Sequence, residues 1–447
     1  MSKTVLIGCL LFVSYGLFAQ RTVAKIDSLL KAYIALNKFN GTVLVSERAT
    51  VIFNKGYGYA DNSEKNAFSA KSVFQIGSLS KSFTSLLILK LFNDKGISID
   101  EPVSKFVDNC SFGKEVTIRH LLTHTSGIYE PLNDPEYFNQ LTSNNRLSNK
   151  ERNSYFKDKP LAFTPGTKFS YSNSGYNLLG SIIEIISGMT YEDCLRKYIF
   201  EPFKMRHSGF DFRAVSVNKR KVVGYSYLSK TKQIKAGSWN PYALFSSGAL
   251  YSTTDDLLKF YNGLKTYKLV SKENFQTAIT PYLNGYGLGW YIDSIGADRI
   301  VNHGGNIDGF SSYYLMNLQN DICIIILSNI TTTSLERIGN SIYKIVTNKP
   351  YTLPKPKSEI TVNKDHLAAY VGKYEISENQ FATISLEGDY LFLQLNKELK
   401  YKLYPEKNNL FFVKEEDFEI EFLSFNDKAL QIKIRQGLST KVGDKLN

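Results

Sequence analysis

Cysteine is scarce in this chain of 447 residues, and its placement excludes a disulfide-built protein. Cys9 lies in an apolar N-terminal segment, and Cys110, Cys194 and Cys323 are scattered through the remainder. Scattered cysteines do not form a disulfide framework, and no pair has the short spacing of a zinc motif. One disulfide among Cys110, Cys194 and Cys323 is possible, and the sequence does not assign it. Cys323 stands in an apolar run, which favours a small buried residue.

Histidine is equally rare, with five residues in all. His120 and His124 stand four positions apart, so a helix would place them on one face. No third ligand and no His-Glu-x-x-His pattern accompanies them, as a zinc site of this spacing would require. We therefore expect neither a metal nor another cofactor.

Acidic residues are fewer than basic ones, 42 against 54, which gives a formal charge of +12. Lysine and arginine are nevertheless spread along the chain. The sequence lacks both an RNA-binding signature and a basic helix, so we predict no nucleic-acid partner. The charge is typical of a soluble protein that works in anionic surroundings.

The most conspicuous apolar run stands at the N-terminus. Lys3 is followed by the apolar stretch Val5 to Phe18 and by the small residue Ala19. Residues 1–19 therefore predict a secretory signal peptide. The run is shorter than the ~20 residues of a membrane-spanning helix, so we expect no stable span. Cys9 comes too early for a lipoprotein signal, and we expect a secreted or periplasmic protein.

The remaining chain predicts an α+β domain over residues 20–348. A helix over 21–39 and a hairpin over 42–57 precede an apolar helix over 83–92, and residues 97 to about 270 read as helices and loops. Strand patterns return from Gly285, and a last helix carries one apolar face. We expect one antiparallel sheet, flanked by helices, whose strands come from both ends of the domain around an all-helical insertion. The late strands are expected at 287–292, 299–303, 311–318 and 322–330, and the helix face at Leu335, Ile338, Ile342 and Val346.

A linker over residues 349–365 is marked by Pro350, Pro354 and Pro356. Beyond it, residues 366–447 alternate apolar and polar positions between turn signals, a pattern typical of an antiparallel sheet with one buried face. We predict a small C-terminal β-barrel-like domain. Its expected strands are 370–376, 382–386, 390–395, 410–413, 418–425 and 429–434.

The segment Phe74-Gln75-Ile76-Gly77-Ser78-Leu79-Ser80-Lys81 stands where a strand pattern gives way to the apolar helix. Residues three apart share a helix face, so the Lys81 amine can approach the Ser78 hydroxyl. A buried lysine tends to lose its proton and can then act as a base toward a nucleophile. The pattern Ser-x-x-Lys is common in helices, so its meaning depends on partners elsewhere.

Two further motifs follow Ser78-x-x-Lys81 in order: Tyr171-Ser172-Asn173, and His303-Gly304-Gly305 at the end of a predicted strand. With these motifs the chain resembles the superfamily of serine β-lactamases and penicillin-binding proteins. It is most similar to the class C–like branch, which also holds D-alanyl-D-alanine carboxypeptidases, D-aminopeptidases and esterases. The resemblance runs from about Phe39 to Val346.

The resemblance implies acyl transfer, with Ser78 as the nucleophile. Lys81 and Tyr171 would share the proton transfers, and Tyr171 would need the nearby Lys81 cation to serve as a base at neutral pH. Asn173 would orient Lys81 and donate to the substrate carbonyl.

The same resemblance implies an oxyanion hole made of two backbone N–H groups. Here they would belong to Ser78 and to Asn306, on the strand that carries the third motif. Gly304 and Gly305 would let the substrate approach that strand closely, and His303 would stand at the edge of the binding site.

His303 departs from the β-lactamase pattern, in which this position usually carries lysine. Lysine stays charged at neutral pH, whereas free histidine titrates near ~6.5. A fixed cation for a substrate carboxylate is therefore lost, which weakens the β-lactamase interpretation and fits the peptidase and esterase relatives.

We therefore predict a secreted serine hydrolase that forms an acyl-enzyme on Ser78. The expected substrates are small peptides, with D-residues implied by the resemblance and cell-wall fragments as one source. Two alternatives stay open. One is an esterase or weak β-lactamase that uses the same site, and the other is a catalytically weak binding or scaffolding protein. The oligomeric state and the role of the C-terminal domain are open as well.

Overall fold

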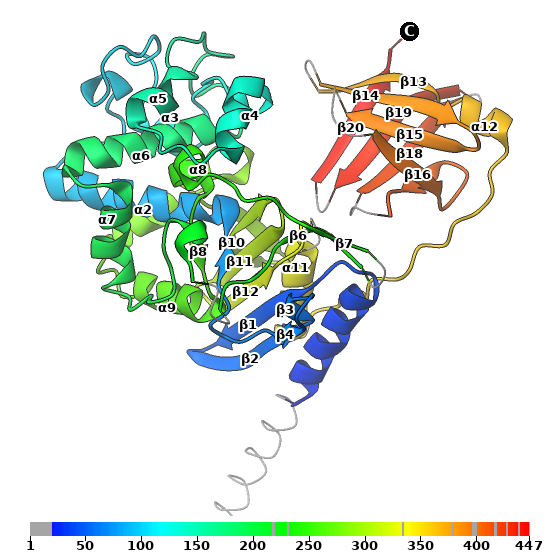
Figure 1. The fold of residues 1–447 in the computed structure, drawn as a ribbon, viewed down its shortest axis with the longest axis horizontal. Helices are drawn as coiled ribbons and strands as arrows, with labels where there is room; N and C mark the ends of the chain where they lie inside the picture. Colours follow the sequence, from blue (N-terminus) through cyan, green and yellow to red (C-terminus); the bar gives the residue numbers. More distant parts are fainter. Residues whose placement is uncertain are drawn as a thin grey trace, which may run out of the picture. The chain divides into compact units, whose positions relative to one another are not determined.

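A computed structural model describes residues 20–216, 220–229, 232–332, 335–377, 380–395, 400–414, 418–425, 428–436 and 439–446. The predicted signal peptide, residues 1–19, lies outside this part of the chain. The chain divides into two compact units (Figure 1). Among the described residues, the first unit comprises those up to 331 together with 339–351, and the second comprises those within 332–338 and from 352 onward.

The first unit is built on a six-stranded antiparallel sheet with the order β2-β1-β12-β11-β10-β9 (Figure 1). Strand β1, the first in the chain, pairs with β12, the last strand of this sheet in the sequence, with Gly41 opposite Ser328. This pairing confirms that the sheet draws its strands from both ends of the domain. The strands are β1 Gly41–Glu47, β2 Thr50–Tyr57, β9 Tyr291–Ile295, β10 Asp298–Ile307, β11 Phe310–Asn317 and β12 Ile322–Ser328.

The central helix of the first unit is α2, Ser80–Lys95. Nearly every residue from Ser80 to Phe92 is buried, as expected for a helix surrounded by other elements. Gly96 ends it in the left-handed conformation, with φ of 66°. This helix therefore provides a rigid base for the residues at its N-terminal end.

The insertion between the early and late strands consists of helices joined by loops and short strands (Figure 1). A helix over residues 20–35 precedes the sheet, and Ile26, Leu29 and Leu30 on its inner face are fully buried. The other helices are α3 Ile118–Leu122, α4 Pro135–Thr142, α5 Asn149–Ser154, α6 Asn173–Ser187, α7 Tyr191–Leu195, α8 Pro241–Gly248, α9 Thr254–Leu264, α10 Lys272–Ala278 and α11 Leu335–Val346. Short strands also occur: β3 Tyr59–Asp61, β4 Asn66–Ala67, β5 Phe74–Gln75, β6 Tyr225–Leu228, β7 Gln233–Lys235 and β8 Tyr251–Ser252.

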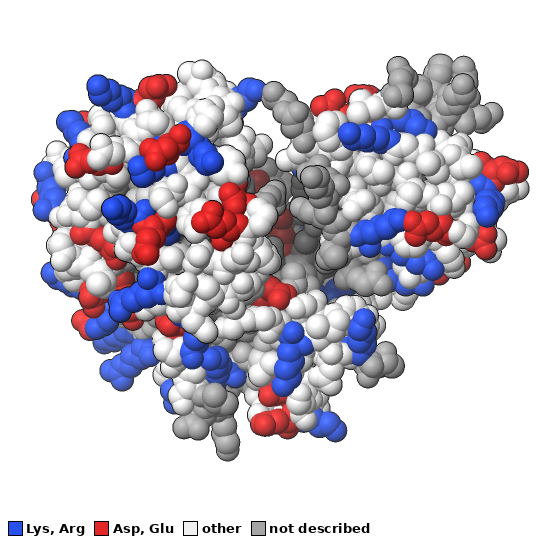
Figure 2. All heavy atoms as spheres, turned by 45° about the horizontal axis from the view of Figure 1, so that its top comes forward, with Lys and Arg blue, Asp and Glu red and all other residues white. Residues whose placement is uncertain are grey.

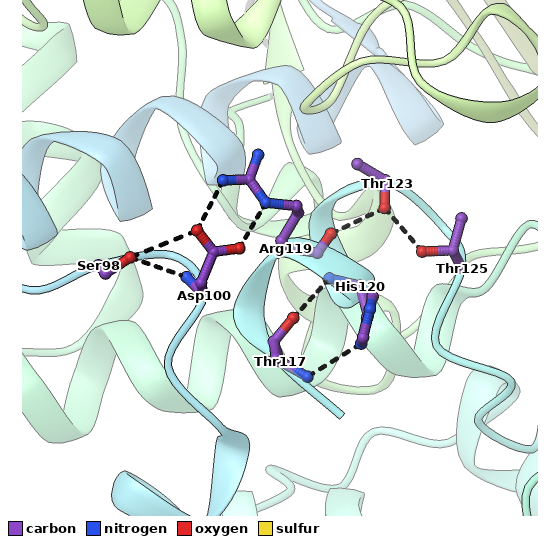
Figure 3. Close-up of polar contacts among 7 residues, drawn as sticks. All are labelled: Ser98, Asp100, Thr117, Arg119, His120, Thr123 and Thr125. Atoms are coloured by element: carbon purple, nitrogen blue, oxygen red, sulfur yellow. Dashed lines mark hydrogen bonds and ion pairs between the residues drawn. The ribbon is translucent and has the colours of Figure 1, made fainter. Parts of the chain in front are cut away.

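The two histidines that stand four residues apart, His120 and His124, each accept a hydrogen bond from the backbone. Figure 3 shows the contacts of His120. The Nδ1 atom of His120 accepts a hydrogen bond from the Thr117 N–H at 3.2 Å and completes the cap at the start of α3. His124 has a φ of 57°, which ends the helical conformation after one turn. Its Nδ1 atom accepts from the Ser172 N–H at 3.0 Å. Among the described residues, no group of His, Cys, Asp and Glu side chains is arranged to hold a metal ion.

The strand expected at residues 287–292 begins later, at Tyr291. The preceding residues form a loop that docks on α2, because Ser82 Oγ and Ser85 Oγ donate to the carbonyls of Gly289 and Leu288, both at 2.7 Å. Gly289 has a φ of 80°, and a Cβ there would stand 2.7 Å from the Cβ of Ser85. Gly289 thus serves close packing on α2 and not strand pairing.

The second unit contains a closed antiparallel barrel of eight strands. Its core is rich in aromatic residues, and Tyr370 stacks on Phe422 with ring centroids 4.1 Å apart. The predicted barrel-like domain is confirmed, with two strands that the prediction lacked, β16 and β20. The elements are α12 Lys364–Ala368, β13 Gly372–Ser377, β14 Gln380–Glu387, β15 Tyr390–Leu395, β16 Lys400–Pro405, β17 Leu410–Phe412, β18 Phe418–Phe425, β19 Lys428–Gln436 and β20 Ser439–Lys445.

Basic and acidic side chains are interspersed over the face of the first unit that Figure 2 shows. In the described part of the chain, no helix combines the length and the apolar character needed to cross a membrane. Cys110, Cys194 and Cys323 are all free thiols, and the last two are buried. The disulfide that the sequence left open is therefore absent among these residues.

Candidate active site

Ser78 lies in a tight turn, Gly77–Leu79, between β5 and α2. Gly77 adopts a φ of 52°, which a side chain would strain. The Ser80 hydroxyl donates to the Gly77 carbonyl at 2.7 Å and accepts from the Leu250 N–H at 3.1 Å. Ser80 is thus a structural residue that fixes the turn, while Ser78 lines an open cleft.

Lys81, the second residue of α2, is fully buried. Its Nζ atom donates to Ser78 Oγ at 3.2 Å, to Asn173 Oδ1 at 2.8 Å and to the Ser247 carbonyl at 2.7 Å. These three acceptors come from three different helices or turns, so they fix the amine beside the nucleophile. The structure thereby brings together Ser78, Lys81 and Asn173 as the sequence predicted.

The burial of Lys81 lowers the pKa of its amine to about 7, although the nearby Glu130 carboxylate raises it. The cause is the loss of hydration, which penalises the charged form. Nζ also lies 4.7 Å from the ring centre of Tyr171 and 5.6 Å from that of Tyr176. Aromatic faces of this kind partly compensate a cation, and at neutral pH both the charged and the neutral amine are populated.

Tyr171 shares a hydrogen bond with Ser78, and its ring packs on that of His124 with centroids 4.1 Å apart. Burial raises the pKa of its phenol well above the ordinary value, an effect that the hydrogen bond to Ser78 partly offsets. At neutral pH Tyr171 is therefore a neutral phenol that can donate a proton or a hydrogen bond. In the resting site, Lys81 is the better base of the two.

The start of α6 holds Asn173 in place. Ser172 caps this helix, because its hydroxyl accepts from the Gly175 N–H at 3.0 Å. Glu130 adds a carboxylate at the same helix end and accepts from the N–H groups of Asn173 and Ser174 at 2.5 and 3.3 Å. A negative charge is stabilised at a helix N-terminus, yet burial dominates and raises the pKa of Glu130.

Sequence reasoning missed Glu130, which is close enough to Lys81 to influence its pKa. No spacing pattern marks it, since it follows the turn at Gly127 in a stretch without periodicity. Its proximity to α6 arises only from the fold, which brings together residues 43 positions apart.

Strand β10 passes directly against the Ser78 turn. A Cβ on Gly305 would stand 2.0 Å from the Ile76 carbonyl oxygen and 2.9 Å from the Ser78 nitrogen. A Cβ on Gly77 would stand 3.0 Å from the Asn306 nitrogen. The backbones of Ser78 and Asn306 therefore lie together at the cleft, as an oxyanion hole needs. Gly305 therefore allows the turn and the strand to touch, which differs from the close approach of substrate that the sequence suggested. Gly304 has more space, since a Cβ there would stand 3.6 Å from the Ser312 carbonyl oxygen.

His303 is buried behind the strand, with 1% of its surface exposed. Its Nδ1 atom lies 2.6 Å from the Gly304 carbonyl, an acceptor, so Nδ1 carries the proton and Nε2 accepts from the Tyr286 hydroxyl at 3.0 Å. Burial lowers the pKa of His303 to about 3, and the imidazole is neutral at physiological pH. The structure thus places this side chain among supporting aromatic residues and not among those that line the cleft.

The cleft beside Ser78 has a volume of about 310 Å³. Of the predicted site residues, Ser78, Asn173 and Asn306 line it directly, while Lys81 lies beneath them. The described lining consists of Gly77, Ser78, Leu132, Tyr137, Leu141, Asn173, Trp239, Leu244, Ser247, Gly248, Asn306, Ile307, Asp308 and Thr331.

Comparison with known proteins matches the two units to two families. Residues 26–347 match the family described as Beta-lactamase, and residues 356–444 match a domain of unknown function, DUF3471. The serine, lysine, tyrosine and asparagine described above all fall within the first match.

Similar proteins include Penicillin-binding protein 4* of Bacillus subtilis, which is 30% identical over 88% of this chain and 92% of its own length. The octameric penicillin-binding protein homologue from Pyrococcus abyssi has 25% identity and a TM-score of 0.66, over 94% of this chain and 99% of that one. A D-amino acid amidase from Ochrobactrum anthropi shares the fold, with 20% identity and a TM-score of 0.64 over 72% of this chain and 97% of its own.

Proposed function

Because the chain belongs to the beta-lactamase family, whose relatives are serine hydrolases, we propose that it hydrolyses amide or ester bonds through an acyl-enzyme on Ser78. One observation carries the proposal. The Lys81 amine stands 3.2 Å from Ser78 Oγ and has a pKa of about 7, so a neutral base faces the nucleophile at physiological pH.

In the first step, Lys81 accepts the Ser78 proton while Ser78 Oγ bonds to the substrate carbonyl carbon. The N–H groups of Ser78 and Asn306 stabilise the oxyanion that develops on the carbonyl oxygen. Since Asn173 Oδ1 accepts from Lys81, the N–H groups of the same amide can donate to the substrate.

Collapse of the intermediate breaks the bond to the leaving amine or alcohol, which takes a proton from the Tyr171 phenol. The proton held by Lys81 then restores Tyr171. Water repeats the sequence on the ester of Ser78 and releases the acid, so the enzyme returns to its starting state. Tyr171 suits this role because its raised pKa keeps it protonated until the leaving group departs.

We propose small peptides as the leading substrates, with D-residues included because of the similarity to penicillin-binding proteins. Esters are the second candidate, since the same groups cleave both bonds. Turnover of β-lactams should be weak, because the buried neutral His303 supplies no cation for their carboxylate. We also propose that the protein is secreted after removal of residues 1–19. Measuring the mass of the mature chain isolated from its natural host tests this proposal.

The experiment is a substrate panel on the wild type and on Ser78→Ala. It includes a p-nitrophenyl ester, a D-alanyl-D-alanine peptide, a D-aminoacyl peptide and a chromogenic cephalosporin. We expect turnover of the ester and of at least one peptide, with a loss of about a thousandfold or more in Ser78→Ala. Turnover that survives in Ser78→Ala would exclude the mechanism, and absence of any turnover or adduct would favour a scaffolding protein.

A further inference from the structure

The cleft beside Ser78 has one apolar side. Leu132 lies in the turn Pro131–Asn133, Tyr137 and Leu141 lie on one face of α4, and Leu244 lies on α8. Trp239, in the segment before α8, completes this side. Side chains four positions apart on a helix meet on one face, which explains why Tyr137 and Leu141 act together.

The apolar side continues to the surface. Leu132 is 39% exposed and Phe138 is 48% exposed, and Phe138 meets Trp239 edge to face with ring centroids 6.2 Å apart. Large apolar side chains that remain exposed at the entrance of a cleft mark a surface that a ligand covers. The group that enters here must itself be apolar.

The charge of the cleft is one-sided. Among the described residues that line it, Asp308 alone carries a full charge. Its carboxylate accepts from Ser226 Oγ at 2.7 Å and from the Gly237 N–H at 3.2 Å. Both donors are neutral, so neither of them forms an ion pair that would offset the negative charge of the Asp308 carboxylate. A carboxylate on the substrate would therefore be repelled, and an ammonium group would be attracted.

We propose, building on the hydrolase function above, that this cleft selects acyl donors with a bulky apolar group and without a negative charge. The Trp239 wall, defined as Leu132, Tyr137, Leu141, Trp239 and Leu244, determines the size preference. Asp308 determines the charge preference and favours donors with a free amine, such as an apolar aminoacyl amide or ester.

Two series of p-nitrophenyl esters test the two preferences separately. The size series is acetyl, butyryl and octanoyl. The charge series is D-phenylalanyl with its ammonium group, neutral 3-phenylpropanoyl, and phenylsuccinyl with its carboxylate. In the wild type we expect kcat/KM to rise along the size series and to fall from the ammonium to the carboxylate donor, the charge effect shrinking as salt is added.

Trp239→Ala should lower kcat/KM for the octanoyl ester about tenfold or more and change the acetyl ester less than about threefold. Tyr267→Ala, at an exposed aromatic outside the cleft lining, is the matched control. Equal losses for both esters would mean that Trp239 supports the fold and selects nothing.

Asp308→Asn keeps an acceptor for Ser226 while it removes the charge. It should reduce the ratio of kcat/KM between the D-phenylalanyl and phenylsuccinyl esters about tenfold and leave the size series unchanged. Asp94→Asn, an exposed acid at the end of α2, should leave that ratio intact. A change in the size series alone would show that Asp308 only positions the segment before Trp239, and the charge preference would be rejected.

The outcomes distinguish this inference from the function on which it rests. Turnover that depends on Ser78 but is equal for all donors overturns the inference and retains the hydrolase. Turnover that persists in Ser78→Ala overturns the hydrolase mechanism itself.

Discussion

At the scale of single residues, Lys81 decides the chemistry. A lysine in water has a pKa near ~10.4 and is a poor base at neutral pH. Complete burial changes this, because Nζ has three acceptors but little hydration. The same burial that costs stability makes the amine reactive, as is common at active sites.

The pH dependence of the reaction follows from this pKa. The active form has a neutral Lys81 amine, so kcat/KM should rise as the pH increases through about 7 and then level off. No decline should follow up to about pH 9, because the pKa of Tyr171 lies well above its ordinary value. Stopped-flow or steady-state rates with an ester whose own groups do not titrate provide the measurement. A rate that falls between pH 6 and 8 would rule out Lys81 as the base.

Glu130 should tune this pH dependence. Its carboxylate raises the pKa of Lys81, so Glu130→Gln should move the rising limb to lower pH by up to about one unit. Glutamine retains acceptors for the N–H groups of Asn173 and Ser174, which keeps the start of α6 intact. The control is Glu192→Gln at the exposed start of α7, which should leave the limb where it was. If the pH at which kcat/KM rises is unchanged or higher in Glu130→Gln, the electrostatic role of Glu130 would be contradicted.

At the scale of elements, the contact between β10 and the Ser78 turn forms the site. Gly305→Ala would place a Cβ 2.0 Å from a backbone oxygen, which cannot move aside as a flexible side chain could. We expect the melting temperature to fall by several degrees, which corresponds to about 1–3 kcal/mol. In Gly304→Ala the nearest atom is at 3.6 Å, so its melting temperature should match the wild type within about two degrees. Equal melting temperatures for the two variants would show that the strand does not press against the turn.

Much of this arrangement could be predicted from sequence, because periodicity reports burial. The predominantly apolar run from Phe83 to Phe92 indicated a buried helix, and the alternation in β15 and β18 indicated strands with one face inside. Strands β16 and β20 were missed because both are rich in lysine and polar residues, and backbone pairing within the closed barrel holds them.

Other features depended on contacts between distant residues. Helix α3, Ile118–Leu122, is only about one turn long, since His124 leaves the helical conformation and its ring accepts from the Ser172 N–H. Glu130 and the buried position of His303 could not be read from local patterns either. A motif identifies residue types in order, whereas the side of the strand on which His303 packs is set by the surrounding aromatic residues.

At the scale of the whole molecule, the chain has two units with separate cores, and each matches its own family. The first unit ends at Tyr351, and the second continues with residues 352–363, which contain no helix or strand. The motif residues all belong to the first unit, so hydrolysis should not require chemistry from the barrel.

Limited proteolysis tests this division. Backbone without internal hydrogen bonding is the preferred site of cleavage. We therefore expect early cuts within residues 351–356, ahead of Ile360, whose N–H donates to the Pro405 carbonyl, and two resistant fragments. The fragment with Ser78 should retain most of the ester turnover after cleavage. Cuts that fall first inside the sheet or the barrel, or complete loss of turnover on linker cleavage, would show that the units depend on each other.

The most direct test of the proposed chemistry is the location of the acyl group. The protein is quenched in acid during turnover of the octanoyl p-nitrophenyl ester and analysed by intact mass and peptide mapping. We expect one octanoyl group per chain, carried by Ser78 and absent from Ser78→Ala. An acyl group on another residue, or one that persists in Ser78→Ala, would contradict it.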